Sequence, residues 1–347
     1  VAGMSTFAPS FDLPPAFRGV FRADTAARAL YAEGAGIARC LPQAVAVPAD
    51  VEALGELVRW AKRTGHALIP RGSGSGMAAG AVGPHVVVDL SRFTDVLPVD
   101  VTARRVVAGV GATRQAVDAA ARAEGLRFPV DPSSGAFCTV GGMTATNAAG
   151  ARSLRFGAMR PWVQGVQAVF DDGSVVWVRR GEAWPVTVPA VARLRQAFDQ
   201  VAAQVPVGLL RHEGVRKESS GYGLAAAMDS GDLVDLLVGS EGTLAAFAAI
   251  ELALIPVAGA TATVLVTFDS LDAATSCAVD AAEAGVSACE LLDRTFLDVA
   301  ARGGETGVPA NADAVLLIEV EGEDRSHCGI LIETVASMCR SHGAIEI

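Results

Sequence analysis

The segment PRGSGSGMAAGAV, residues 70–82, decides how the rest of this chain is interpreted. Three glycines alternate with two serines behind Pro70 and Arg71, and Gly80 follows. Glycine tolerates positive φ and lets the backbone approach a ligand closely, and successive N–H groups in such a turn can hold an anion, usually a phosphate. The segment therefore indicates either a flexible surface loop or a phosphate-binding loop.

Two familiar phosphate motifs do not match this segment. A Walker loop requires a Lys-Ser or Lys-Thr pair after its glycines, and none follows here. In the dinucleotide fingerprint G-x-G-x-x-G, counted from Gly74 and Gly76, the third glycine falls on Ala79. A pyrophosphate loop of another type remains as the functional alternative to a surface loop.

The composition of the 347-residue chain predicts two folded domains or one large one, since 51% of the residues are hydrophobic and 19% are charged. The net charge of −10 argues against a nucleic-acid partner, which would require clustered Lys and Arg. Six cysteines without C-x-x-C spacing disfavour a metal or iron–sulfur site and favour reduced thiols. We find no signal peptide and no transmembrane segment, so we expect a cytoplasmic protein, with association at the inner membrane face left open.

Hydrophobic periodicity predicts a mixed order of strands and helices. A helix at residues 51–65 is expected to begin after Asp50 and end at Gly65, and Asp172-Gly173 predicts a hairpin. Further strands are expected at 67–70, 85–91 and 103–111, and further helices at 112–125 and 190–205. Beyond residue 258, strands at 261–268, 288–293 and 314–323 alternate with helices at 271–285, 294–303 and 327–343, and the last residues, IEI, indicate a next strand.

Two more glycine-rich segments accompany the first. Residues 131–157, DPSSGAFCTVGGMTATNAAGARSLRFG, are neither helix nor strand by pattern, and a loop of this length inside a domain is usually functional. The third segment, VGSEGTLAAF at 238–247, follows a strand-like DLVDLLV at 232–238, and RKESSGYGL at 216–224 lies upstream. Together they offer the backbone groups, hydroxyls and cations that would hold a large polar cofactor.

As a set, these segments resemble the FAD-linked oxidases of the vanillyl-alcohol oxidase and p-cresol methylhydroxylase (PCMH) superfamily. ACELLDRTFLDVA further resembles the start of the substrate domain in the glycolate oxidase and D-lactate dehydrogenase branch. The resemblance implies an α+β fold in three parts. These are an N-terminal extension at 1–39, a two-part PCMH-type FAD-binding domain at 40–257, and an incomplete ferredoxin-like α/β substrate (cap) domain at 258–347.

The resemblance implies FAD as a noncovalent cofactor, because the flavin-linked histidine of some relatives is replaced here by Ser73 and Ser75. Cys138 is the alternative attachment point, although a buried, unreactive thiol is the favoured interpretation. The residues expected to contact FAD are Arg71, Gly72, Ser73, Gly74, Ser75 and Gly76 in the first segment, Asp131, Pro132, Thr139, Gly141, Gly142, Thr146, Asn147 and Gly150 in the second, and Glu241, Gly242 and Phe247 in the third.

The resemblance also implies oxidation of a small D-2-hydroxy acid, glycolate or D-lactate, by hydride transfer from Cα to flavin N5. Arg160 and Lys217 are the cations expected near flavin and substrate. The histidine- and glutamate-rich catalytic motif of this branch is absent, so we expect no metal site in this chain and catalytic residues beyond Ile347. The expected electron acceptor is a protein, a quinone or an iron–sulfur module, and an oligomer is compatible with the sequence.

Three alternatives stay open at this point. The first alternative is a noncatalytic FAD-binding electron-transfer subunit. The second is the oxidase half of a larger dehydrogenase that is fused to an iron–sulfur module. The related reductase of UDP-N-acetylmuramate biosynthesis is less favoured, because the 2-hydroxy acid branch explains the strand and helix pattern after residue 258 better.

Overall fold

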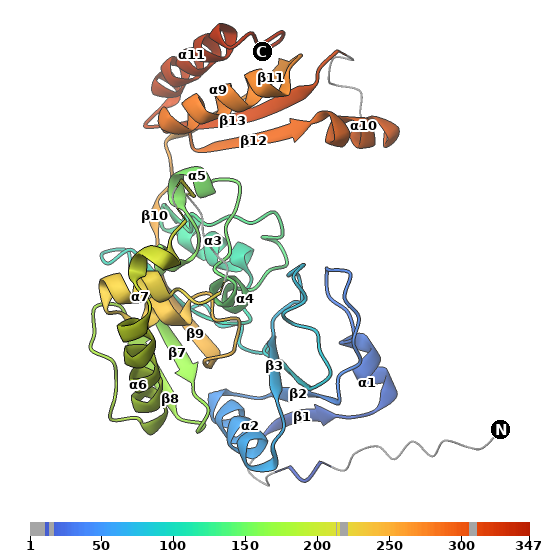
Figure 1. The fold of residues 1–347 in the computed structure, drawn as a ribbon, viewed down its shortest axis with the longest axis vertical. Coiled ribbons are helices and arrows are strands. Elements are labelled where there is room, and N and C mark those ends of the chain that lie inside the picture. The colour runs from blue at the N-terminus through green and yellow to red at the C-terminus, as the bar shows by residue number, and fades with distance from the viewer. Residues whose placement is uncertain (1–10, 14–16, 213, 216–220, 305–310) are drawn as a thin grey trace, which may run out of the picture. The chain divides into compact units, whose positions relative to one another are not determined.

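A computed structural model describes residues 11–13, 17–212, 214–215, 221–304 and 311–347 (Figure 1). The chain divides into two compact units. The first comprises Val1–Phe128, Ser134–Ala148 and Met159–Ile255, and the second comprises Pro129–Ser133, Ala149–Ala158 and Pro256–Ile347. The second glycine-rich segment is therefore divided between the units.

The first unit contains a four-stranded sheet that carries the opening segment at the end of one strand. Its order is β1 (Gly19–Arg22), β2 (Ala44–Pro48), β4 (Val86–Asp89) and β3 (Leu68–Arg71). β1 is antiparallel to β2, whereas β2, β4 and β3 are parallel. The strand predicted immediately before the glycine loop is confirmed as β3.

Two helices belong to this part of the chain, α1 (Thr25–Leu30) and α2 (Val51–Thr64). The predicted limits of α2 are confirmed: the Asp50 carboxylate accepts a hydrogen bond from the Ala53 N–H, and Gly65 ends the helix at φ +72°. A capping acid and a left-handed glycine are local signals, so the sequence alone locates them.

A second, antiparallel sheet completes the two-part first unit. Its order is β5 (Arg105–Gly109), β9 (Ala246–Ala253), β7 (Val163–Val169) and β8 (Val175–Arg179), and β7 and β8 form the predicted hairpin. β6 (Leu126–Arg127) and β10 (Ile255–Pro256) form a two-stranded sheet. The helices of the first unit are α3 (Arg114–Ala123), α4 (Val140–Ala145), α6 (Pro189–Gln204), α7 (Leu224–Ser230) and α8 (Leu233–Leu237), with 3₁₀ turns η1 (Arg160–Trp162) and η2 (Val207–Leu210).

Two of the predictions from pattern are wrong. Within the segment 232–238, predicted as a strand, residues 233–237 form the helix α8; all five of its residues are buried, so no polar face marks the helical period. The segment 131–157 contains the short helices α4 and α5 (Ser153–Phe156). Two glycines lower the helix propensity of α4, but Gly141 is needed there because a Cβ would lie 2.5 Å from the Val110 Cβ.

The second unit has the ferredoxin-like strand order that the sequence predicts. β11 (Ala260–Phe268), β13 (Ala314–Gly322) and β12 (Ala288–Asp293) form an antiparallel sheet in that order. α9 (Leu271–Glu283) and α11 (Arg325–Ser341) pack on one face, around Phe268 and Leu316, and α10 (Arg294–Arg302) follows β12. The final IEI makes a single bridge, Glu346 to Thr267, at the free edge of β11.

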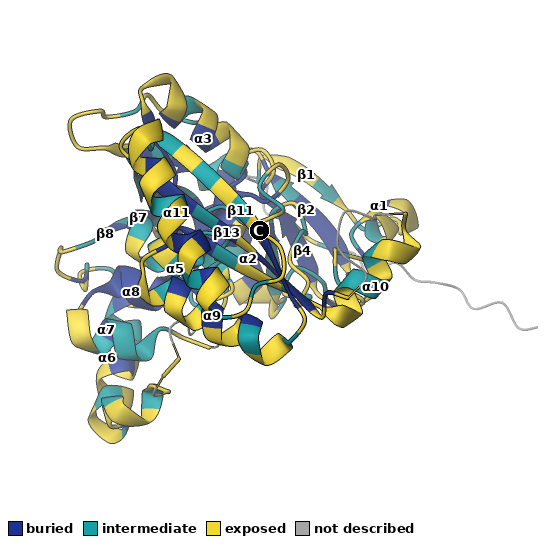
Figure 2. Cartoon of the chain, turned by 90° about the horizontal axis from the view of Figure 1, so that it is seen from above, coloured by how far each residue is buried: buried dark blue, intermediate teal, exposed yellow. Residues whose placement is uncertain are grey.

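Figure 2 shows the outward sides of α9 and α11 exposed, as expected for helices that cover one face of a sheet. Among the described residues, no helix is both long and apolar enough to cross a membrane.

Candidate functional site

The opening glycine segment leaves β3 at the carboxyl end of a parallel strand, the edge where open α/β sheets bind ligands. Gly74 has φ +74°, a conformation that glycine adopts without strain. None of the N–H groups of residues 72–76 donates a hydrogen bond within the part of the chain that the structure describes. Gly72, Gly74 and Ser75 are half-buried, and backbone donors at such positions are rarely left unpaired, so their N–H groups are available to an anion.

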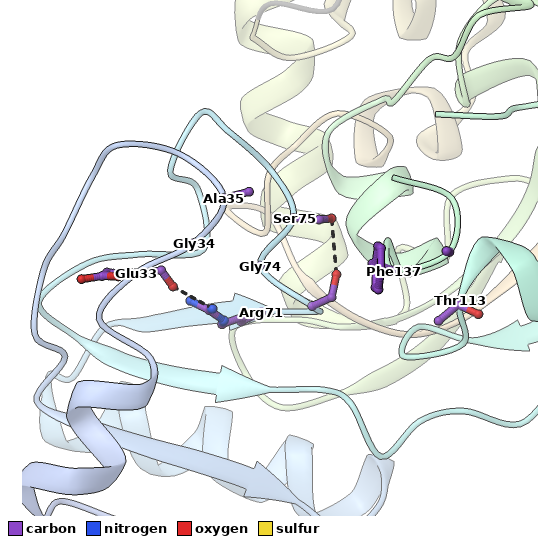
Figure 3. A pocket seen from close by; sticks show the side chains of 10 residues that line it. Glu33, Gly34, Ala35, Arg71, Gly74, Ser75, Thr113 and Phe137 are labelled. Atoms are coloured by element: carbon purple, nitrogen blue, oxygen red, sulfur yellow. Dashed lines mark hydrogen bonds between the residues drawn. The ribbon is translucent and has the colours of Figure 1, made fainter. Parts of the chain in front are cut away.

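These N–H groups border a cavity of about 580 Å³ in the first unit (Figure 3). Such a volume lies in the range of small-molecule sites, about 300–1,000 Å³. Four separate segments supply its lining: Glu33, Gly34, Ala35, Arg71, Ser73, Gly74, Ser75, Thr113, Ala136 and Phe137. The cavity thus joins four of the predicted residues, Arg71, Ser73, Gly74 and Ser75, to six that were not predicted.

The missed residues had only weak signals in the sequence. Gly34 and Gly36 lie in an AEGAG run outside the recognised motifs, and a Cβ on Gly36 would lie 2.2 Å from the Met77 carbonyl oxygen. Phe137 is 72% exposed at the cavity, on a turn whose N–H groups bond back to Ser134. Nothing local connects these residues to the first segment, because the contacts span tens of residues.

Helix α4 lies directly behind the loop. Thr139 is buried at its N-terminus and accepts a hydrogen bond from the Gly142 N–H, while the Thr146 hydroxyl donates to the Gly142 carbonyl 2.9 Å away. A Cβ on Gly72 would lie 2.2 Å from Thr139 Oγ1. The structure therefore brings the first and second segments together, with both threonine hydroxyls engaged by the helix.

The third segment packs against the end of α4. The Gly239 and Glu241 N–H groups donate to the carbonyls of Thr144 and Ala145, at 3.0 and 2.9 Å. Glu241 is exposed at φ +52°, and Gly242, at φ +76°, would place a Cβ 3.0 Å from Pro70 Cγ. The Gly-Ser-Glu-Gly turn thus lies beside the end of β3, next to the glycine loop.

Asn147 and Arg160 join the same region. Asn147 is buried at φ +47°, and its Oδ1 accepts a hydrogen bond from the Arg160 N–H at 2.9 Å. The Arg160 guanidinium donates to the Asp235 carbonyl, whereas the Asp235 carboxylate pairs with Arg180 at 2.9 Å. Burial lowers the pKa of Arg160. Arg160 is half-buried, and a half-buried cation whose nearest carboxylate is already paired is the kind of group that binds an anion.

The remaining predicted residues lie elsewhere. Phe247 is buried in β9, opposite Ala168 of β7. Lys217 lies in residues 216–220, outside the described residues. Asp131, Pro132 and Gly150 belong to the second unit.

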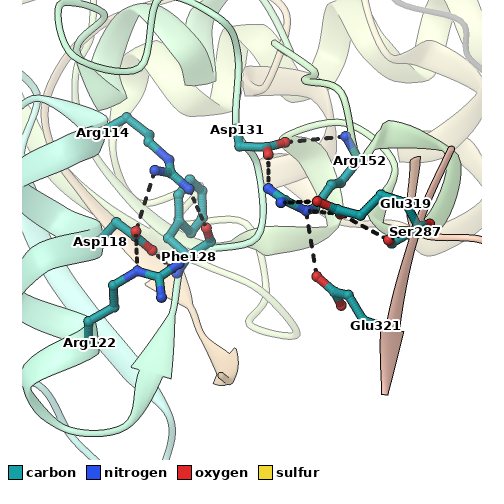
Figure 4. A network of polar contacts seen from close by, with 9 residues as sticks. All are labelled: Arg114, Asp118, Arg122, Phe128, Asp131, Arg152, Ser287, Glu319 and Glu321. Carbon is teal, nitrogen blue, oxygen red and sulfur yellow. Dashed lines mark hydrogen bonds and ion pairs between the residues drawn. The ribbon is translucent and has the colours of Figure 1, made fainter. Parts of the chain in front are cut away.

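In the second unit, Asp131 is held by an arginine cluster (Figure 4). Its carboxylate pairs with Arg152, whose guanidinium also makes two 2.7 Å contacts with the Glu319 carboxylate on β13. A Cβ on Gly150 would lie 2.2 Å from the Asp131 backbone. These contacts fix residues 131 and 150–152 against β13, a structural role that the sequence did not indicate.

The described residues hold no group of three or more His, Cys, Asp or Glu that could bind a metal ion. Cys138 is 6% exposed, and burial raises the pKa of its thiol, which disfavours the nucleophilic thiolate.

Comparison with protein families gives two matches in separate parts of the chain. The family model described as "FAD binding domain" matches residues 42–179, and "FAD linked oxidases, C-terminal domain" matches residues 258–347. The first match contains the glycine loop, the cavity residues from 71 onward and α4.

Two curated relatives match most of the chain. A D-lactate dehydrogenase of Archaeoglobus fulgidus is 29% identical over 87% of this chain and 58% of its own length. The glycolate oxidase subunit GlcD of Bacillus subtilis is 25% identical over 88% of this chain and 57% of its own length. The chain therefore spans somewhat more than half of these relatives.

Among solved structures, an alkyldihydroxyacetonephosphate synthase superposes with a TM-score of 0.67 over 94% of this chain and 57% of that one. At 18% sequence identity, this likeness concerns the fold alone.

Proposed function

Because the chain belongs to the FAD-linked oxidases, we propose that it is part of an FAD-dependent oxidoreductase that oxidises a small D-2-hydroxy acid. The names of the two relatives, a D-lactate dehydrogenase and a glycolate oxidase subunit, support this substrate class. The chain covers 58% and 57% of those relatives, so the support comes from the shared domains.

The observation that carries the proposal is the row of unpaired N–H groups at residues 72–76 beside the cavity. A pyrophosphate fits this cradle, because backbone donors bind phosphate oxygens without a covalent or metal link. The one acidic residue of the lining, Glu33, is paired with Arg39 at 3.1 Å. A Cβ on Gly76 would meet nothing within 4 Å, so the approach to the loop is open there.

We assign the binding of FAD to the chain's own groups as follows. The first loop holds the FAD pyrophosphate, and the Glu241–Gly242 turn beside it binds another part of the cofactor. The chemistry that bound FAD would supply is the acceptance of a hydride from the substrate Cα. Arg160 supplies the cation that orients the anionic end of substrate or flavin, and Lys217 remains a second candidate outside the described residues.

The cofactor is proposed to be noncovalent. The loop carries Ser73 and Ser75 and no histidine, and Cys138 is buried with a raised pKa. Free cysteines throughout, all six of them, support a reducing compartment such as the cytoplasm.

A second candidate is a noncatalytic FAD-binding subunit that passes electrons to another protein, a quinone or an iron–sulfur module. The observation that favours it is that one relative is itself named a subunit. It shares the FAD cradle with the first candidate and differs in its response to substrate.

The first test is an absorbance spectrum of the purified 347-residue chain before and after acid precipitation. We expect flavin bands that move into the supernatant, because the cofactor is held without a covalent bond. Flavin left in the pellet would instead assign a covalent link, and a chain that neither carries nor takes up FAD would overturn the cradle.

The second test adds D-lactate or glycolate to the FAD-loaded protein without oxygen, with L-lactate as the control. Bleaching of the flavin band by a D-2-hydroxy acid and not by L-lactate is expected for the first candidate. A protein that binds FAD but is bleached by none of these acids favours the electron-transfer subunit.

A further inference from the structure

We propose that Arg71 is a positioning residue: it shapes the pyrophosphate cradle from below and does not itself bind phosphate. The inference rests on the proposed function, since the cradle is argued to hold FAD. It gives Arg71 a different role from the other loop residues, whose N–H groups are proposed to bind the pyrophosphate.

The Arg71 side chain is 9% exposed and donates to main-chain carbonyls from both sides of the loop. Nη2 donates to the Glu33 carbonyl at 2.8 Å (Figure 3). Nη1 donates to the Ala81 carbonyl at 3.2 Å. Nη1 also reaches the Tyr31 carbonyl at 3.5 Å. One guanidinium therefore joins residues 31–33 to residue 81, two segments that flank the cavity wall.

Gly74 lies directly on this guanidinium. A Cβ there would be 2.4 Å from Arg71 Nη2 and 2.8 Å from Cζ. The Gly74 carbonyl in turn accepts a hydrogen bond from the Ala35 N–H at 2.9 Å. The loop is thus held between Arg71 beneath it and residue 35 beside it.

Arg71 is itself fixed by the first sheet. Its Cζ lies 5.3 Å from the ring centroid of Tyr31, whose hydroxyl donates to the Asp89 carboxylate. Burial and this hydrogen bond raise the pKa of Tyr31 to about 12, so the hydroxyl stays protonated at neutral pH. Arg71 and Asp89 are partners across the β3–β4 pair, so the support is anchored in the sheet.

A phosphate that drew the guanidinium away from these carbonyls would leave partly buried acceptors without a partner, which costs more than the bond itself. The geometry therefore predicts that Arg71 orders the loop already in the FAD-free protein.

The experiment compares Arg71→Met and Arg71→Lys with the unmodified chain, well below the melting temperature of each. It measures the Kd for FAD and for ADP, which shares the pyrophosphate, and amide hydrogen exchange of residues 31–35 and 72–82 without ligand. For Arg71→Met we expect about tenfold or greater loss of affinity for both ligands and faster exchange of both segments. Arg71→Lys keeps the charge but not the planar guanidinium, so its affinity for both ligands should lie between those of the unmodified chain and Arg71→Met.

Gly74→Ala gives an independent variant, because its Cβ would displace the guanidinium. Gly74→Ala should lower the FAD affinity less in the Arg71→Met background than in the unmodified chain, because the guanidinium that its Cβ would displace is absent there. Gly208→Ala, in the first unit but outside the loop, is the matched glycine-to-alanine control: its Cβ would meet nothing within 4 Å, so FAD affinity should stay within about twofold.

Lost affinity with unchanged exchange in the FAD-free protein would make Arg71 a direct phosphate ligand and overturn the inference. Unchanged affinity in Arg71→Met would overturn it as well. If the unmodified chain binds neither FAD nor ADP, the proposed function fails, while the exchange comparison still decides whether Arg71 orders the loop.

Discussion

The three glycines of the first loop, within residues 72–76, have three different surroundings. At Gly72 a side chain would collide with Thr139 Oγ1, so glycine there permits the close approach of loop and helix α4. At Gly76 there is open space, so glycine there keeps the approach to the cavity clear. Gly74 combines positive φ with contact to Arg71. The sequence shows three equivalent glycines, and only their neighbours distinguish them.

Gly72→Ala is expected to weaken FAD binding by about tenfold or more and to destabilise the first unit by about 1–3 kcal/mol, because a Cβ 2.2 Å from Thr139 Oγ1 must push the loop from α4. Isothermal titration with FAD and urea unfolding measure the two effects. Gly208→Ala, whose Cβ would meet nothing within 4 Å and which lies outside the loop, should show neither. Equal behaviour of the two variants would contradict the contact between loop and helix.

At the scale of elements, short helices are held by charged anchors rather than by propensity. α8 begins at Asp232, whose carboxylate accepts from the Val234 N–H, and its middle residue Asp235 pairs with Arg180. Burial raises the pKa of Asp235, but hydrogen bonds from Arg180 and Ser230 outweigh it, and the pKa lies below its ordinary 3.8. The charged form of Asp235 is therefore the stabilising one.

Asp235→Asn should destabilise the first unit by about 3 kcal/mol at pH 7, because it leaves Arg180 without its buried partner. A depressed pKa means that this stabilisation is complete above about pH 4 and is lost as the pH falls through the folded-state value. The difference between variant and unmodified chain should therefore shrink below pH 4. Urea unfolding at pH 7 and pH 3.5 measures it, with Asp229→Asn, an exposed partner of Arg211, as the control.

The Arg152 cluster anchors two loops in the second unit in the same way. Arg152→Ala would leave Asp131, Glu319 and Glu321 as partly or fully buried carboxylates without this arginine, at a cost of about 3–5 kcal/mol. Faster limited proteolysis at residues 149–158 should report the loss. Arg155→Ala removes a more exposed, 3.4 Å contact and should change cleavage little; equal cleavage of the two variants would speak against the cluster as an anchor.

At the scale of the whole molecule, the two units can be followed separately. All four tryptophans, Trp60, Trp162, Trp177 and Trp184, lie in the first unit. Tryptophan fluorescence therefore reports on the unit that contains the glycine loop and its cavity, while circular dichroism reports on both.

FAD at one hundred times its Kd should stabilise the first unit by about 2.7 kcal/mol, because ligand that binds only the folded state shifts its unfolding equilibrium. Thermal unfolding followed by tryptophan fluorescence, with and without FAD, measures this shift. Riboflavin, which lacks the pyrophosphate, is the control and should shift it much less. An equal shift by riboflavin would contradict the proposal that the loop binds FAD through its pyrophosphate.

The sequence by itself determined the features whose causes are local. The cap at Asp50 and Gly65, the Asp172-Gly173 hairpin and the strand before the glycine loop depend on neighbours a few residues away. The strand and helix alternation after residue 258 was likewise predicted from pattern, and the set of glycine motifs indicated the FAD-linked family, whose resemblance implied the ferredoxin-like domain.

Only the tertiary structure decided which residues meet. It made residues 233–237 a helix, because burial on every side removes the polar face that marks a period. It brought Glu33 and Phe137 to the cavity and joined the Arg71 guanidinium to carbonyls 38 and 10 residues distant. It also assigned Asp131 and Gly150 to the second unit through Arg152 and Glu319. These outcomes depend on contacts between distant segments, and such contacts leave no periodicity or spacing in the chain.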